Sequence, residues 1–90
     1  MNFEVSPKSF EKYLSYEDAK LYIFALGDGW RFPSVKEYEL CLSHHDFESG
    51  LHYTDSDRLV AFGWRSFKHI ERTPFYDTCF IRPFRDLKAN

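Results

Sequence analysis

The segment Leu26–Ser34, with the sequence LGDGWRFPS, constrains the fold of this chain more than any other stretch. Gly27 follows an apolar helical stripe and suits the left-handed residue that commonly ends a helix. Pro33 disfavours helical geometry at the residue before it, so the WRF stretch is expected to be extended. Ser34 and Glu37 have the spacing of a capping box. The segment therefore predicts the end of one helix, an extended piece and the start of a second helix.

The residues before this segment predict the first helix, over Tyr16–Leu26. Ser15 and Asp18 have the spacing of an N-cap and the third helical position. Apolar side chains then recur at positions 19, 22, 23 and 26, which places them on one helical face. The second helix is expected to end near Leu42.

Short extended segments flank the two helices. Phe3–Val5 alternates and predicts a first strand, and Ser9 is expected to begin a short helical turn that runs through Tyr13. Residues 43–57 are polar, which predicts a loop that holds a short extended piece at His52–Tyr53.

The last third of the chain predicts three strands. Arg58–Trp64 is apolar on both faces, so it is expected to lie centrally in a sheet. Ser66–Ile70 has mixed faces, and Thr78–Phe84 is the last strand. Pro83 cannot donate a ladder hydrogen bond, so that strand is expected to be frayed or to lie at an edge there. Two helices followed by antiparallel strands predict an α+β fold, in one domain over residues 1–90.

The composition limits the classes of partner. The net charge is −2, which gives no general affinity for nucleic acid or for an anionic membrane. No apolar stretch approaches the roughly 20 residues that span a bilayer, and no leader segment is recognisable, so we expect a cytoplasmic protein. Cys41 and Cys79 fit that compartment as reduced, buried residues, and a disulfide between them is the less favoured alternative.

Several motifs resemble those of a family of small, uncharacterised bacterial and phage domains that share a G-W-R-L-P-T-x-x-E core. Leu14–Ala19 and Leu26–Ser34, followed by Glu37 and Tyr38, carry the resemblance, although Phe32 and Ser34 replace the usual Leu and Thr. Ile81–Asp86 resembles the family's closing strand. The family is similar to the C-type-lectin-like fold of formylglycine-generating-enzyme-type domains. The resemblance thus implies a small C-type-lectin-like domain, with two helices packed on a twisted, mostly antiparallel sheet.

The resemblance implies a scaffold and no particular chemistry. The Glu-Pro-Asn and Trp-Asn-Asp motifs of calcium-dependent sugar binders do not occur, and the cysteine pair of formylglycine-generating enzymes belongs to a much longer chain. The core motif is instead expected to organise the fold. Trp30 is expected to anchor the interior, and Arg31 is expected to form a bidentate pair with Glu37 or Asp86. Pro33 and Arg82 complete the set of structural residues.

The sequence supports neither a metal site nor a catalytic centre. His44-His45-Asp46 and His52 offer metal-binding side chains, but adjacent histidines point in different directions and no HxH or HxxxH spacing occurs. No nucleophile elbow or phosphate-binding loop is present. We therefore expect no enzyme activity, no cofactor and no bound metal.

Two kinds of binding remain open. Trp64–His69 alternates aromatic and basic residues, a pattern that can bind single-stranded nucleic acid, and with the loop at 43–58 it makes a small-ligand or nucleic-acid binder the alternative function. The leading hypothesis is a non-catalytic module that binds another protein, since exposed aromatic residues near arginine are typical interface anchors. The family's phage members also allow an inhibitor of a host protein. The candidate partner-binding residues are His44, His45, Tyr53, Arg65, Phe67, His69, Phe75 and Tyr76.

Overall fold

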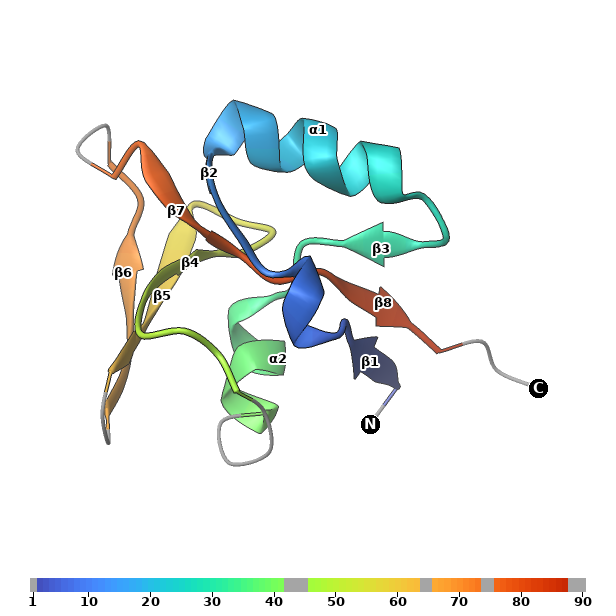
Figure 1. Cartoon of the computed structure of the whole chain (residues 1–90). Helices are drawn as coiled ribbons and strands as arrows, with labels where there is room; N and C mark the ends of the chain where they lie inside the picture. The colour runs from blue at the N-terminus through green and yellow to red at the C-terminus, as the bar shows by residue number, and fades with distance from the viewer. Residues whose placement is uncertain (1, 42–45, 64–65, 74–75, 88–90) are drawn as a thin grey trace.

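A computed structural model of the chain describes residues 2–41, 46–63, 66–73 and 76–87. Its helices and strands confirm the α+β class (Figure 1). The elements follow in the order β1 (Phe3–Val5), the 3₁₀ turn η1 (Lys8–Phe10), β2 (Lys12–Ser15), α1 (Tyr16–Leu26), β3 (Trp30–Arg31), α2 (Val35–Leu40), β4 (Gly50–Tyr53), β5 (Arg58–Gly63), β6 (Ser66–Glu71), β7 (Thr78–Ile81) and β8 (Phe84–Asp86). None of the helices in these ranges is long and apolar enough to cross a membrane.

The strands form two sheets where the sequence predicted one. The larger sheet has the order β2-β7-β4-β5-β6, and the smaller has the order β1-β8-β3. All strand pairs are antiparallel except β4 with β7, which pair in parallel at His52 and Phe80. β5 was predicted to lie centrally; it is paired on both sides, between β4 and β6, but the middle strand of the five is β4.

The prediction of a single last strand over Thr78–Phe84 is wrong. Residues 78–81 pair with β2 and β4, whereas Phe84–Asp86 pairs with β1 and β3 in the other sheet. The break falls at Arg82 and Pro83, because Pro83 has no N–H to continue a ladder. The Pro83 carbonyl instead accepts a hydrogen bond from the Ser6 amide at 3.0 Å. One chain segment therefore links the two sheets.

The predicted turn from Ser9 to Tyr13 is also wrong in its second half. The 3₁₀ turn ends at Phe10, and Lys12–Ser15 forms an edge strand along β7. The Tyr13 ring packs on Phe80, with 4.8 Å between ring centroids. Pairing with a strand more than 60 residues away thus overrides the local preference for a turn.

Both helices begin where their caps predicted. The Ser15 hydroxyl accepts a hydrogen bond from the Asp18 amide at 3.2 Å, and α1 has the expected bounds. Ser34 and Glu37 form the capping box at the start of α2. Gly27 has a φ of 62°, which a residue with a Cβ adopts only with strain. α2 ends at Leu40, slightly before the end predicted near Leu42.

Tyr38 of α2 occupies the centre of the first core cluster. Its ring is fully buried and contacts Phe47, Phe62 and Phe84, with 5.3 to 5.5 Å between ring centroids. Its hydroxyl donates to the Tyr53 carbonyl at 3.1 Å. A second cluster beneath α1 is built from Ala19, Tyr53, Leu59, Cys79 and Ile81. Cys41 and Cys79 are free and buried, as the sequence predicted.

Trp30 does not occupy the interior position that the sequence predicted for it. Its indole is half-buried, with the Phe10 ring against its edge at 5.6 Å and the Arg85 guanidinium over its face at 4.2 Å. β3 is an edge strand of the small sheet, so one side of its residues lies open. Within the motif, Pro33 is fully buried and Phe32 packs against the second cluster.

The predicted bidentate pairing of Arg31 is confirmed for Glu37, and Asp86 accepts a single further hydrogen bond. Its two terminal nitrogens each donate to one oxygen of Glu37 at 2.7 Å, and Nη2 also donates to Asp86 at 2.6 Å. The hydrogen bonds from Arg31 lower the pKa of the Glu37 carboxyl, although partial burial opposes the shift. Arg31 thus joins β3, α2 and the end of β8.

Candidate functional site

The outer face of α1 carries large apolar side chains. Ala19, which is buried, and the partly buried Tyr22, Ile23 and Leu26 form the inner stripe that anchors the helix on the second core cluster. On the opposite side, Phe24 is 86% exposed and Leu21 is 66% exposed. A surface helix normally carries polar residues on that side, so two large apolar residues there indicate a contact surface.

A shallow groove of about 440 Å³ lies beside Phe24, between α1 and the turn into β3. Gly27 and Gly29 lie in the turn, and the positions that a Cβ would occupy on them have no neighbour within 4 Å. The half-buried ring of Trp30 also lines the groove. The full lining is Lys20, Ile23, Phe24, Gly27, Gly29, Trp30 and Phe32. We call this groove, together with Leu21 and Phe24, the α1–β3 surface.

Two charged residues lie beside the α1–β3 surface: Lys20 lines its groove, and Asp28, in the turn after α1, lines a separate hollow with Arg85. Lys20 pairs with Glu17 at 3.1 Å and lies over the Tyr16 ring. Asp28 follows the helix with a φ of 54° and is exposed, and its carboxylate forms no ion pair with a side chain in the described ranges. An apolar centre with charged residues beside it is typical of a protein-binding surface.

Of the residues predicted to contact a partner, the four that the structure describes differ in exposure and do not share one open surface. Tyr53 is 1% exposed, and its hydroxyl donates to the Leu14 and Asp77 carbonyls, so the prediction of a surface role for Tyr53 is wrong. Phe67 is partly buried against Phe62, so its ring is only partly available for base stacking. His69 is exposed on β6, and Tyr76 is exposed in the connection between β6 and β7. His44, His45, Arg65 and Phe75 lie outside the described residues.

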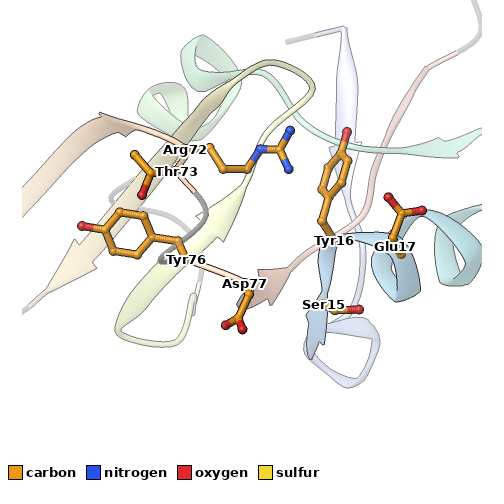
Figure 2. A pocket seen from close by; sticks show the side chains of 7 residues that line it. All are labelled: Ser15, Tyr16, Glu17, Arg72, Thr73, Tyr76 and Asp77. Atoms are coloured by element: carbon orange, nitrogen blue, oxygen red, sulfur yellow. The ribbon is translucent and has the colours of Figure 1, made fainter.

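A second hollow, of about 420 Å³, separates the start of α1 from the connection between β6 and β7 (Figure 2). Figure 2 shows Arg72 and Tyr16 extending toward one another, with the guanidinium 4.0 Å from the ring centroid. Tyr76, Glu17 and Asp77 line the remaining sides. The hollow therefore combines tyrosine rings with charges of both signs, a lining that suits a small polar aromatic ligand.

A buried ionic cluster lies inside the molecule. The Glu11 side chain is 2% exposed and accepts hydrogen bonds from Arg82 at 3.1 Å and from Lys8 at 3.0 Å. His52 Nε2 lies 3.5 Å from the same carboxylate, and its ring is fully buried. Burial alone would raise the pKa of Glu11, but the neighbouring His52 ring, the hydrogen bond from Lys8 and the hydrogen bond from the Glu48 amide outweigh it and hold that pKa at about 2.

This cluster is a structural tie. Arg82 also donates to the Ser6 carbonyl at 3.0 Å. The cluster therefore holds the chain around η1, and through His52 also β4, to the segment that links the two sheets. The side chains of Glu11, His52 and Arg82 are too deeply buried to contact a partner. Arg82 therefore has a structural role. The pairing of Arg82 with Glu11 was not predicted from the sequence, because the two residues are 71 positions apart.

Within the described ranges, no three histidine, cysteine or acidic side chains gather into a group that could hold a metal ion. Comparison with models of protein families, with curated proteins and with solved structures finds no match to this chain. The α1–β3 surface was also missed from the sequence. The available signal was the placement of Leu21 and Phe24 on the face opposite the apolar stripe of the predicted helix.

Proposed function

We propose that this protein is a non-catalytic module that binds another protein through the α1–β3 surface. The exposure of Phe24 beside the groove carries the proposal, because a projecting aromatic ring next to an apolar hollow is a typical interface anchor. The proposed fold is a C-type-lectin-like scaffold, supported by the two helices and by the pairing of β1 with β8. The free, buried cysteines support a cytoplasmic setting.

Site-specific photo-crosslinking tests the proposal. A benzophenone amino acid replaces Phe24 in one variant and Glu39 in a control, because Glu39 is also exposed but lies on α2. After illumination in cells of the source organism, we expect a crosslinked protein from position 24 that is absent from position 39. No product at position 24, or the same products from both positions, would contradict the proposal.

The hollow in Figure 2 supports a second candidate function, the binding of a small polar aromatic ligand. The stacked pair of Arg72 and Tyr16 carries this alternative, since a planar cation over a ring can extend into a stack with a third planar group. Ligand-observed NMR against a library of small aromatic acids tests it. Saturation transfer to a library member should be present for the unaltered chain and lost for Arg72→Ala.

A further inference from the structure

The fully buried His52 ring has an oxygen acceptor beside each of its two nitrogens. Nδ1 lies 3.4 Å from the Gly50 carbonyl oxygen, and Nε2 lies 3.5 Å from a carboxylate oxygen of Glu11. Neither oxygen can donate a proton to the ring. The carbonyl has none, and Glu11, whose pKa is about 2, is ionised at neutral pH and only accepts. A favourable contact on either side therefore needs a proton on the ring.

A neutral histidine satisfies only one of these two contacts. It carries a proton on one nitrogen and a lone pair on the other, so the lone pair would face an oxygen atom. The neighbouring rings hold the imidazole in its orientation, with Phe80 stacked on it at 5.1 Å and Phe62 across it at 4.9 Å between ring centroids. Apart from the Glu11 contact, Nε2 has no polar partner in the described part of the chain.

We propose that His52 is a buried imidazolium ion, protonated on both ring nitrogens at neutral pH, and that the loss of one proton at higher pH loosens the contact between β4 and the chain after η1. Gly50 and His52 belong to β4, and Glu11 lies between η1 and β2. The ring therefore joins these segments only while it carries both protons. The site is in the interior, so this inference is independent of the α1–β3 surface.

The charge balance of the ionic cluster favours the protonated ring. Among the described residues of the cluster, the carboxylates outnumber the lysine and arginine cations by one. The carboxylates are those of Glu11, Asp46 and Glu48, and the cations are Lys8 and Arg82. A protonated His52 supplies the missing positive charge next to Glu11, the buried one of the three carboxylates. A buried charge is stable only when its partners balance it.

Two effects oppose the second proton. Burial disfavours a charged ring, and Arg82 places another positive charge on the same carboxylate. From α2, the Tyr38 ring lies 5.9 Å from the imidazole between centroids, and burial raises the pKa of Tyr38 well above its usual value, so Tyr38 is neutral. Glu11 is the charged group that contacts the ring directly, and the face of the stacked Phe80 ring also attracts a cation. These two contacts favour the imidazolium ion.

Nitrogen-15 NMR of the full chain tests the protonation state directly. The His52 signals are assigned through nuclear Overhauser effects to the rings of Phe62 and Phe80, and the exposed His69 is the internal reference. At pH 7.5 an ordinary histidine carries the second proton in about one molecule in ten. We expect His52 to carry it in most molecules at that pH. A His52 ring that is neutral in most molecules would overturn the inference.

A pair of variants tests the role of Glu11. Glu11→Gln removes the charge that contacts the ring, so His52 should lose its second proton at pH 7.5. Glu17→Gln, at an exposed position on α1, is the matched control and should leave both protons in place. The measurement reports the state of the ring, so a general loss of stability would not give the same result. Two protons retained in Glu11→Gln, or one lost in both variants, would contradict the proposal.

The dependence of stability on pH tests the loosening. Above about pH 7 the unfolded chain holds a mostly neutral histidine, whereas the folded chain keeps the extra proton, so stability is greatest at lower pH and falls as the pH rises. The unfolding equilibrium constant should therefore rise by up to about tenfold per pH unit between about pH 7 and 8. His52→Gln should lack this rise, and His69→Gln should keep it. Parallel urea-unfolding profiles for the unaltered chain and His52→Gln would refute the loosening, and the NMR measurement on the unaltered chain decides the protonation state even where His52→Gln does not fold.

Discussion

At the level of single residues, Glu11 is an almost fully buried carboxylate whose charge must be balanced by its neighbours. Its carboxylate faces Arg82, Lys8 and His52 from three separate segments, and almost none of it reaches water. A buried charge is stable only while its partners remain, because each unpaired ion would carry a large desolvation penalty. The cluster therefore makes the junction between the sheets sensitive to single substitutions.

Glu11→Gln tests this sensitivity. Removing the charge leaves Arg82 and His52 buried without their shared partner, so we expect a loss of about 3 kcal/mol in the free energy of unfolding. Urea unfolding followed by circular dichroism measures the change. Glu17→Gln, at an exposed position that pairs with Lys20, should change it by less than about 1 kcal/mol. Equal effects of the two substitutions would show that the cluster does not stabilise the fold.

Acid should weaken the fold through the same residue. The pKa of Glu11 is about 2 in the folded chain, below its ordinary value of 4.5. A lowered folded-state pKa stabilises fully above the unfolded pKa, and this contribution is lost as the pH falls from about 4.5 toward 2. The urea midpoint should therefore fall more steeply over that range in the unaltered chain than in Glu11→Gln. Parallel pH profiles would contradict this account.

At the level of elements, the helices were predictable because their signals are local. Ser15 and Ser34 cap the two helices three residues before their bonding partners, and Gly27 supplies the positive φ that ends α1. The strand β2, and the separation of β7 from β8 at Pro83, were not predicted, for the opposite reason. Those features depend on strand pairing across most of the chain, which no short sequence window contains.

The cap of α2 gives a prediction at this scale. Ser34→Ala removes the acceptor for the Glu37 amide, and we expect a loss of about 1 kcal/mol in the free energy of unfolding. Ser9→Ala, at an exposed position in η1, is the control and should change stability by less than about 0.5 kcal/mol. Thermal and urea unfolding give both values. A loss as small as that of the control would mean that the capping box is not a source of stability.

The candidate site shows the same division between local and distant information. The outward placement of Leu21 and Phe24 follows from helical spacing alone, so that half of the α1–β3 surface could be found in the sequence. The groove could not, because it forms only where α1 packs beside β3. For Tyr53 the prediction failed in the opposite direction: this aromatic residue next to a predicted loop was expected at the surface, but it is part of the core.

At the level of the whole molecule, Arg31 connects elements that lie far apart in the sequence. Its guanidinium binds Glu37 in α2 and Asp86 at the end of β8, 55 positions away. Arg31→Lys keeps the charge but loses the two-pronged geometry, so we expect a loss of about 1.5 kcal/mol in the free energy of unfolding. Urea unfolding measures it. Lys36→Arg, an exposed exchange of the same residue types, is the control, and equal effects would contradict the role of the fork.

The closure of the small sheet determines where the chain can be cut and rejoined. The Leu87 amide donates to the Asn2 carbonyl at 2.9 Å, so these two backbone positions are neighbours. A short glycine-rich linker can therefore join them, and new ends can be opened between Ser56 and Asp57, in the exposed turn between β4 and β5. Such a circular permutant would carry a fused reporter on that turn and still present Phe24 to its binding partner.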